Sequence, residues 1–349
     1  MIEQMDSLID NSDDDRSKTL FSILIKQRDY IKIDDLSNQL FLSRNQLKHA
    51  LNCLRTDLSK FKLKIKIKPH YGIKIEGDEL SIRKAITEYG IIDILHQDYQ
   101  IIKNILSSCI VNTEYVVSDT VVNELVNQIA IQCERVEAKH RIEFDEKTIH
   151  IVRHESEFMI AQQVALLLSK LKGIYLPEEE QIHLTMHLSS RNNSLKHSIH
   201  VDKDAFILTE RILKELDEES IYAFSNDLNL QLAITNHLIP LKKRINYSLF
   251  LKNPLLTEIK SKLLEAYDLS IKISEIINQE YECKLPEDEI AYFALHINLS
   301  IEQNRHNQRA KKILLICNES QSVARNIETF FRNNFQTYFS DLDVSSLTE

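Results

Sequence analysis

Glycine and proline are scarce in this sequence, whose 349 residues include only 4 glycines and 5 prolines. An all-β fold needs many tight turns built from these residues, so their scarcity argues against an all-β protein. Isoleucine, leucine, lysine, asparagine and glutamate dominate instead, as is typical of mostly helical proteins. The length is enough for two or three domains, and the 43% hydrophobic content is enough for a sizeable core. We therefore predict a mainly α protein.

Long apolar runs and paired cysteines are also missing. No run of about 18 apolar residues occurs, which argues against a transmembrane helix. The acidic start of the chain, MIEQMDSLIDNSDDD, lacks the apolar centre of a signal peptide. The five cysteines are odd in number, widely spaced and never in a CxxC arrangement, which fits reduced thiols. These features predict a cytoplasmic protein without a membrane partner.

The usual motifs of enzymes and metal sites are absent as well. The sequence has no HExxH motif, no Gly-rich phosphate loop and no local hydrolase pattern. His183 and His187 stand at i and i+4, a spacing that can hold a metal, but no nearby motif supplies a dependable third ligand. We therefore predict a protein that is not an enzyme and binds no metal or cofactor.

Charge is unevenly distributed along the chain. The net charge is −9, yet residues 16–84 hold 16 Lys or Arg against 7 Asp or Glu, a local net charge of +9. The rest of the chain must then sum to −18 (−9 minus +9). A basic module on an acidic body indicates that only the first part of the chain meets a polyanion.

Within the basic part, residues 33–58 have the layout of a helix-turn-helix. A short helix leads to a tight turn at residues 41–42, and Ser43 opens a second helix with Gln46 three residues on, a capping-box pattern. The polar side chains of this second helix are the expected DNA contacts. They are Ser43, Arg44, Asn45, Lys48, His49 and Arg55.

A predicted hairpin follows the two helices. Residues 62–68, KLKIKIK, alternate strictly and so predict a strand with one lysine face, and residues 73–75 continue as a second strand after a turn. This hairpin would be the wing of a winged helix, with Lys64 and Lys66 placed for phosphate contacts. A small helical domain with a solvated lysine face is the alternative. The cap, the turn, the wing and the local charge together favour duplex DNA as the partner.

One histidine-bearing segment occurs twice in the chain. LPEEEQIHLTMHL begins at Leu176 and LPEDEIAYFALHI begins at Leu285, and each carries a histidine near its end, His187 or His296. The two segments begin 109 residues apart. The same spacing of 109 residues, called the repeat offset below, aligns NQIAIQCERV (127–136) with NHLIPLKKRI (236–245). It holds without a gap from position 127 to position 188. The sequence therefore predicts a duplicated helical domain of roughly a hundred residues.

The repeated segments also predict which side chains share a helical face. Leu-Pro followed by acids is a helix start, because proline tolerates the first turn and carboxylates favour the N-terminal end of the helix dipole. A histidine on an apolar face is usually a core or interface residue, but its recurrence at matching places favours a function. Three pairs stand seven positions, or two turns, apart: Glu180 with His187, Glu289 with His296, and His237 with Arg244.

These stretches resemble bacterial transcription regulators that carry paired phosphotransferase-system regulation domains (PRDs). The resemblance rests on NHLIPLKKRI, KNPLLTEIK and LPEDEIAYFALHI in the second copy, and more weakly on NQIAIQCERV and LPEEEQIHLTMHL in the first. HYGIKIEGDEL (residues 70–80) resembles the end of the Mga-like DNA-binding module of the same family. Together the matching regions cover most of the chain.

The resemblance implies helical bundles that dimerise and whose histidines are phosphorylated by sugar-phosphotransferase proteins. Each regulation domain of this family typically has two such histidines. In the second copy both positions match, at His237 and His296. In the first copy His187 matches, but Gln128 stands at the earlier position and cannot carry a phosphoryl group. The first copy is therefore expected to have only one of its two phosphorylatable histidines. This is compatible with a virulence-type relative whose regulatory input is modified.

The chemistry of such a switch is consistent with the residues nearby. Imidazole nitrogen is nucleophilic near neutral pH, and a phosphoryl group adds close to two negative charges that an arginine can bind. Arg191 follows His187 by one turn, and Arg244 follows His237 by two. We expect these arginines to hold the phosphoryl group, and the added charge at a subunit interface to alter a homodimer.

The last part of the chain resembles the first unit of a phosphotransferase IIB-like domain. Residues 311–317 predict a buried-type strand, and residues 322–335 have helical spacing. The resemblance makes Cys317, after the strand, a possible phosphorylation site, although NESQS (residues 318–322) replaces the usual Gly-rich loop. One strand and one helix cannot make a closed α/β sheet, so we expect a shortened family member or a piece of a longer protein.

The sequence thus predicts a winged helix-turn-helix followed by two helical-bundle regulation domains and a partial α/β unit. The expected function is a DNA-binding transcription regulator of carbohydrate-uptake or virulence genes. One alternative is a phosphorelay or protein-interaction module with a vestigial helix-turn-helix. Another is an RNA-binding antiterminator, although those proteins begin with a β-rich module. The expected parts are an acidic tail (1–15), the winged helix (16–84), the first regulation domain with a helical linker (85–200), the second regulation domain (201–308) and the IIB-like unit (309–349).

Overall fold

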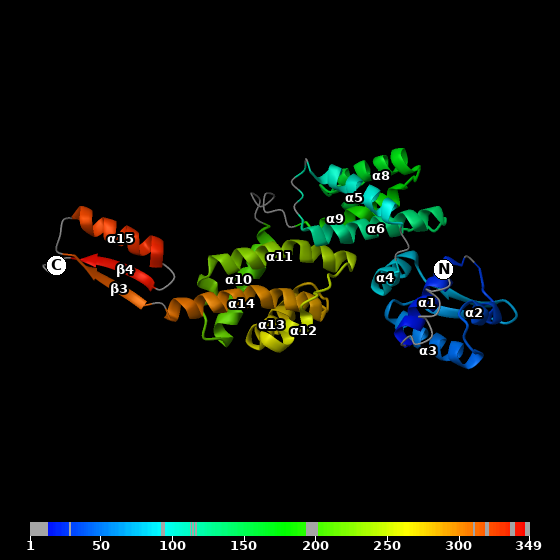
Figure 1. The fold of residues 1–349 in the computed structure, drawn as a ribbon, viewed down its shortest axis with the longest axis horizontal. Coiled ribbons are helices and arrows are strands. Elements are labelled where there is room, and N and C mark those ends of the chain that lie inside the picture. Colours follow the sequence, from blue (N-terminus) through cyan, green and yellow to red (C-terminus); the bar gives the residue numbers. More distant parts are fainter. Residues whose placement is uncertain are drawn as a thin grey trace. The chain divides into compact units, whose positions relative to one another are not determined.

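The computed structural model describes residues 13–27, 29–91, 95–111, 113, 115, 117–192, 202–309, 311–317, 321–335 and 339–345. The chain divides into two compact units, residues 1–192 and 193–349 (Figure 1). The described part contains fifteen α-helices and two small sheets of two strands each, which confirms the mainly α prediction. Residues 1–12 of the predicted acidic tail lie outside the described residues.

The first unit begins with a winged helix-turn-helix, called the head below. Ser43 caps the second helix of the helix-turn-helix, which begins at Arg44, through the predicted capping box with Gln46. One apolar face of this helix, centred on Leu47 and Leu54, is fully buried against the helices before it. The head consists of α1 (Asp13–Lys26), α2 (Ile33–Gln39), α3 (Arg44–Lys60), β1 (Lys64–Lys68) and β2 (Gly72–Glu76).

The predicted wing is present as an antiparallel hairpin. Strand β1 pairs with β2 in a register that sets Ile65 opposite Ile75, and an isolated bridge joins Ile31 to Ile73. Gly72 has φ 115°, and a Cβ atom there would lie 1.9 Å from the carbonyl oxygen of Ile31, so the close approach of these backbones requires glycine. The hairpin is thereby fixed to the core of the head.

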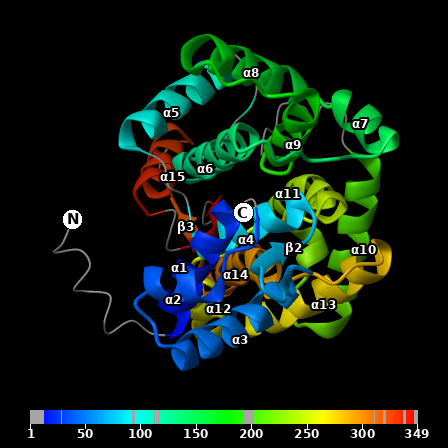
Figure 2. The ribbon, with the colours of Figure 1, turned by 90° about the vertical axis from the view of Figure 1, so that its right-hand side faces the viewer.

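A bundle of five helices follows in the first unit. Ser118 and Asp145 cap two of them with their side chains, and Leu106, Leu125 and Leu184 are fully buried in the shared core. The helices α5, α6, α8 and α9 lie together in both views (Figure 2). The bundle consists of α5 (His96–Ile110), α6 (Asp119–Glu137), α7 (Glu146–Arg153), α8 (Phe158–Lys172) and α9 (Glu178–Ser189).

Helix α4 (Glu79–Tyr89) connects the head to this bundle. Asp78 caps its start, and Gly90, in the left-handed region with φ 65°, ends it. The helix runs across the expected boundary between residues 84 and 85. Ile131 of α6 belongs to the apolar core of the head, so the head and the bundle share packing on either side of α4.

The second unit repeats the bundle with different connections. By the repeat offset, α6 corresponds to α11 and α9 corresponds to α14, and each copy places its Leu-Pro-Glu segment at a helix start. Phe224, Leu238 and Phe293 are fully buried in its core. The unit contains α10 (Lys203–Glu219), the 3₁₀ turn η3 (Phe224–Asn226), α11 (Leu228–Tyr247), α12 (Leu256–Lys262), α13 (Leu264–Glu280) and α14 (Glu287–Arg309), which reaches past the expected boundary at residue 308.

The last elements are β3 (Lys311–Ile316), α15 (Gln321–Phe335) and β4 (Phe339–Ser345). The strand and the helix lie where the sequence predicts them, but the prediction of a buried-type strand is wrong for Leu314 and Ile316, which are 61% and 53% exposed because they lie on one face of the two-stranded sheet. Strand β4 was not predicted, and it pairs in parallel with β3 to make a two-stranded sheet. None of the helices in the described part of the chain combines the length and apolar character that crossing a membrane would require.

Candidate functional site

The clearest cluster of reactive groups lies between α11 and α14 in the second unit. Nη2 of Arg244 lies 3.2 Å from Nε2 of His237 on the same helix, so the pair spaced seven positions apart does meet. Arg244 also donates two hydrogen bonds to the carboxylate of Glu289 on α14, at 2.7 and 2.8 Å. The ring of His296 lies edge-on to His237, with centroids 5.6 Å apart. Two histidines, an arginine and a glutamate therefore form one site.

Burial and charge set the protonation states of this site. Burial works to raise the pKa of Glu289, but His237 and Arg244 outweigh it and hold that pKa at about 2. Burial lowers the pKa of His237 despite the opposing effect of Glu289. Burial, followed by the charge of His237, lowers the pKa of His296 to about 4. Both imidazoles are therefore neutral near pH 7, the form in which a ring nitrogen can act as a nucleophile.

Both imidazoles are partly accessible from solvent, unlike fully buried core residues. The His237 side chain is 14% exposed, and His296 is half-buried. The neighbouring ring of Phe293 lies 4.7 Å from His237, centroid to centroid, and shields one side of the site. A neutral His237 accepts from Arg244 at Nε2, so the guanidinium covers this lone pair and has to shift before the nitrogen can accept a phosphoryl group, after which it lies close to the added charge. That arrangement suits a group that arrives on nitrogen and brings negative charge.

The first unit has a related but more enclosed cluster on α9. Nε2 of His187 lies 3.3 Å from Nε2 of His183, and Nη1 of Arg191 lies 3.3 Å from Nδ1 of His187. The side-chain amide of Gln132 on α6 donates to the carbonyl of Glu180 and faces Nδ1 of His183, both at 3.0 Å. Because the amide N–H is a donor, His183 accepts at Nδ1 and carries its proton on Nε2, directed at His187.

Both histidines of this cluster are buried. Burial, together with nearby positive charge, lowers the pKa of His183 and of His187 well below the ordinary value. Arg83 and Lys84 of α4 contribute positive charge at both rings. His187 therefore stays neutral, but it is less exposed than the cluster of the second unit.

Gln128, which replaces the earlier histidine of the first copy, contacts α4 instead. Its amide donates to the hydroxyl of Thr87 at 3.0 Å. His183, considered from the sequence only as one half of a metal pair, is the histidine that lies beside His187. No group of three or more metal-ligating side chains occurs among the residues that the structure describes.

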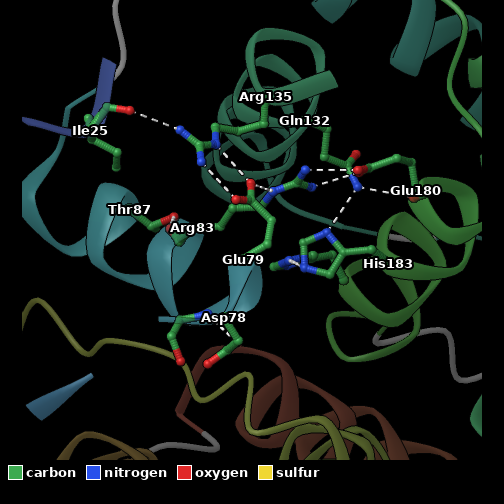
Figure 3. A network of polar contacts seen from close by, with 11 residues as sticks. Ile25, Asp78, Glu79, Arg83, Thr87, Gln132, Arg135, Glu180 and His183 are labelled. Carbon is green, nitrogen blue, oxygen red and sulfur yellow. Dashed lines mark hydrogen bonds and ion pairs between the residues drawn. The ribbon is translucent and has the colours of Figure 1, made fainter. Parts of the chain in front are cut away.

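A buried ion-pair network joins α4 to the bundle of the first unit (Figure 3). Arg135 of α6 donates to both carboxylate oxygens of Glu79, at 2.8 and 2.7 Å. Arg83 donates to Glu79 at 2.9 Å and, through its two terminal nitrogens, to Glu180 at 2.6 and 2.8 Å. The sequence reasoning missed Glu79 and Arg83, although their i, i+4 spacing was a visible signal for a charge pair on α4.

Most of the predicted DNA-contacting side chains lie on the first two turns of α3, and Arg55 lies two turns beyond Lys48. Ser43 receives the N–H of Gln46 at 3.3 Å, and its own N–H donates to the Gln46 side chain at 2.9 Å. Arg44 forms an exposed ion pair with Asp34 of α2, at 2.8 Å. The predicted residues of this helix are all exposed: Ser43, Arg44, Asn45, Lys48, His49 and Arg55.

The wing presents the predicted lysines with one difference. Lys64 and Lys66 are exposed, while Ile65 between them is buried, as the alternation predicted. Lys66 forms an ion pair with Glu76 across the hairpin, at 2.6 Å. At Ile67 the alternation fails, because this side chain is 55% exposed near the tip of the wing, where no core lies beneath it.

Cys317 follows β3 at the predicted position. It is half-buried, and its N–H donates to the carbonyl of Ser345 at the end of β4, at 3.0 Å. Residues 318–320 of the loop after it lie outside the described residues. The structure therefore places Cys317 at the end of a parallel strand pair, and its phosphorylation stays a prediction.

Comparison with known proteins supplies independent information on both units. The family model of the PRD domain matches residues 91–191 and 209–300, and the family model of the Mga helix-turn-helix domain matches residues 6–89. The "Probable licABCH operon regulator" of Bacillus subtilis (strain 168) is 24% identical over 341 residues, which are 92% of this chain and 53% of that protein. "Transcriptional regulator ManR" of the same organism is 22% identical over 335 residues, 91% and 52% of the two chains.

A third relative matches a smaller part. The "GlcA/glcB genes antiterminator" of Staphylococcus carnosus (strain TM300) is 36% identical over 96 residues, which are 26% of this chain and 33% of that protein. The chain spans about half the length of the two regulators that it matches over nearly its whole length.

Proposed function

The chain belongs to the family of proteins that carry PRD domains behind an Mga helix-turn-helix domain, and from this we propose that it is a DNA-binding transcription regulator controlled by histidine phosphorylation. The observation that carries the proposal is the joint presence of an exposed basic head and a buried His–Arg–Glu site in one chain. The relatives that match nearly the whole chain are named as regulators, which favours a protein that is not an enzyme.

The head supports duplex DNA as the partner. The start of α3 is exposed, polar and held in one conformation by its capping box, which suits a helix that enters the major groove. Lys64 on the wing adds an exposed charge for a phosphate. The local net charge of +9 over residues 16–84 gives the head the electrostatic attraction that non-specific DNA binding requires.

The site on α11 and α14 supports phosphoryl acceptance in the second unit. His237 and His296 are neutral and are less buried than His183 and His187, and Arg244 is already placed against His237. In the first unit we propose His187 as the acceptor, with Arg191 as its phosphate-binding partner at 3.3 Å. Cys317 is retained as a further proposed acceptor at the end of β3.

Phosphotransferase-system proteins are the proposed phosphodonors, and carbohydrate-uptake or virulence genes the proposed targets. One of the two regulators that match nearly the whole chain is named as the regulator of an operon, which supports control of transcription by this chain. The proposed place of action is the cytoplasm, where bacterial DNA lies. An RNA-binding antiterminator is less well supported, because two antiterminator matches cover 26% and 43% of this chain, against 92% for the operon regulator.

A homodimer is the proposed assembly. Large apolar side chains are exposed on α8 and just after it, and such surfaces often meet a partner. They are Met159, Leu166, Leu171 and Tyr175. Phosphorylation of either unit would then change the association of two subunits by adding charge. Sedimentation velocity over a range of concentrations would detect the dimer, and a monomer at tens of micromolar would contradict it.

DNA binding is tested by gel shift with a duplex selected from a random-sequence pool, compared with an RNA hairpin of equal length. We expect salt-sensitive binding to the duplex and much weaker binding to the hairpin. Replacing Arg44 and Lys48 with alanine should weaken binding and relax discrimination, whereas Lys64→Ala with Lys66→Ala should weaken binding to all sequences and flatten its salt dependence. Unchanged affinity after all four substitutions would contradict the winged-helix assignment.

Phosphorylation is tested with purified phosphotransferase proteins and phosphoenolpyruvate. We expect acid-labile phosphate on the chain, reduced by His237→Ala or His296→Ala, and never found on Gln128. Because each phosphoryl group can form one to three charge-assisted hydrogen bonds, even one such bond should shift a dimer constant about tenfold or more. Mass spectrometry at neutral to basic pH that found no phosphohistidine with any donor would overturn this half of the proposal.

A further inference from the structure

Helix α4 is held against the first bundle by a pair of its own charged residues. Glu79 and Arg83 are bonded to each other along α4, and each also bonds a charged residue of the bundle. Arg135 on α6 binds Glu79, and Glu180 on α9 binds Arg83. All four side chains are at most 9% exposed, so the chain of charges runs through the interior of the unit.

The second unit shows the same two positions without an inserted helix. The repeat offset places Arg135 on Arg244 and Glu180 on Glu289. In the second unit this arginine and this glutamate bond each other directly, at 2.7 and 2.8 Å. The fold of the bundle therefore allows this arginine and this glutamate to form a direct ion pair. In the first unit, Glu79 and Arg83 of α4 lie between the corresponding two residues instead.

We propose that α4 is an exchangeable plug in the first regulation domain. In the docked state, Glu79 and Arg83 lie between Arg135 and Glu180. In the released state, Arg135 and Glu180 close on each other, as Arg244 and Glu289 do, while Glu79 and Arg83 keep their i, i+4 pair on α4. Breaking a buried ion pair is most costly when it leaves one buried charge without a partner. Neither the docked nor the released state leaves a buried charge unpaired. Two such alternative packings make a bistable element.

The surroundings of α4 fit a helix that can be released. Cavities of about 100 Å³ and 250 Å³ flank the network. The smaller is lined by Ile86 and Arg135 among others, and the larger by Glu79 and Arg141 among others. The cavities leave space beside the charged network, while Ala85 and Ile86 of α4 are buried in the apolar core of the head.

Release of α4 would change contacts both at the head and at the histidine cluster of α9. Arg135 also donates to the carbonyl of Ile25 at the end of α1, at 3.3 Å, so the plug lies next to the head. On the other side, Gln132 joins the carbonyl of Glu180 to the ring of His183. The plug therefore connects the histidine cluster to the DNA-binding head through a short series of bonded groups. The exchange is a property of the fold and does not depend on His187 accepting a phosphoryl group.

The test is hydrogen exchange of the full chain, read by mass spectrometry of peptides from α4, α6 and α9. The variant Glu79→Gln with Arg83→Gln removes the charges of the plug and leaves Arg135 and Glu180 free to pair. We expect peptides within residues 82–89 to exchange about tenfold faster or more, while peptides from α6 and α9 keep their protection. The matched control, Arg153→Gln with Glu178→Gln, removes an exposed ion pair of the same unit and should change none of these peptides.

A third variant tests whether the bundle pair closes. Adding Arg135→Gln to the double variant leaves Glu180 buried without a partner, so α6 and α9 should then lose protection by a further tenfold or so. Unchanged exchange of α4 in the double variant would overturn the proposal, and so would loss of protection in α6 and α9 at that stage. No further effect of Arg135→Gln would do the same. DNA binding and phosphorylation are not read in this experiment, so the proposed function can fail without affecting its result.

Discussion

Arg244 and Glu289 form a buried ion pair in which two N–H groups of the guanidinium meet the two carboxylate oxygens. The side chains are 2% and 0% exposed. Glu289 also accepts the backbone N–H of Leu251 at 2.9 Å, so the carboxylate is bonded on several sides. The arginine that we propose to bind a phosphoryl group on His237 therefore also supports the fold of the second unit.

Removing that arginine should destabilise the second unit strongly. Arg244→Met leaves Glu289 buried without its counter-charge, and breaking a buried pair in this way costs about 3–5 kcal/mol. Urea unfolding of the full chain, followed by circular dichroism, would measure the loss. Lys242→Met, which removes a more exposed partner of Asp204, should cost no more than about 1 kcal/mol. A loss below about 1 kcal/mol for Arg244→Met would contradict the role assigned to the pair.

The second unit should also lose stability as pH falls from 7 to 5. The pKa of His296 is about 4 in the folded state and about 6.5 in an unfolded chain, so between these values the unfolded chain binds more protons. Stability therefore rises with pH in this window and is lost as pH falls, by roughly 2 kcal/mol between pH 7 and 5. Protonation of Glu289, whose pKa is about 2, acts only at lower pH.

Calorimetry of the full chain at the two pH values would measure this effect. His237, whose pKa is also lowered by burial, should add to the loss in the same direction. His296→Asn should reduce the difference between pH 7 and 5, whereas His70→Asn, at an exposed wing residue, should leave it unchanged. An equal pH dependence in all three proteins would show that burial of His296 is not its cause.

Much of the local structure was predictable from the sequence because it depends on neighbouring residues. The capping box of Ser43 with Gln46 uses residues three apart, and the wing uses strict alternation and a tight turn. His237 and Arg244 meet because seven residues make two helical turns. The repeat predicted a duplicated helical domain, and α6 and α9 of the first unit do correspond to α11 and α14 of the second.

The rest depended on which helices meet, which the sequence alone did not specify. Glu79 and Arg83 have an obvious i, i+4 spacing, but their insertion between Arg135 and Glu180 is a tertiary contact between segments far apart in the chain. Strand β4 was missed because its alternating residues form a short segment after a helix, and its pairing with β3 joins segments that lie on either side of α15.

The capping box of α3 should contribute to the stability of the head. Ser43→Ala removes the acceptor for the N–H of Gln46 and should cost about 1 kcal/mol, whereas Ser43→Asp should retain most of the stability. Thermal unfolding, combined with hydrogen exchange of α3, would locate the change. Ser59→Ala, which alters an exposed serine near the other end of the same helix, is the matched control. Equal losses for Ser43→Ala and Ser59→Ala would contradict a specific role for the cap.

Asp34 should oppose DNA binding by the head. Arg44 is paired with Asp34 at 2.8 Å, and their side chains are 78% and 65% exposed. An exposed ion pair contributes only about 0–1 kcal/mol, so a DNA phosphate can displace Asp34, but its negative charge remains close to the DNA. Asp34→Asn should therefore tighten binding of the selected duplex by about threefold at low salt, and the gain should shrink as salt rises.

The dependence of this gain on Arg44 makes the prediction specific. Asp34→Asn should have a smaller effect when Arg44→Ala is already present, because part of the gain comes from freeing that guanidinium. Asp57→Asn provides the matched control, since this carboxylate pairs with Lys60 near the other end of α3. Fluorescence anisotropy titrations of these variants and the parent chain at two salt concentrations would measure the coupling. If Asp34→Asn gave the same gain with and without Arg44, the arginine would not be the residue that Asp34 restrains, and Arg44 would lose its proposed place in the DNA contact.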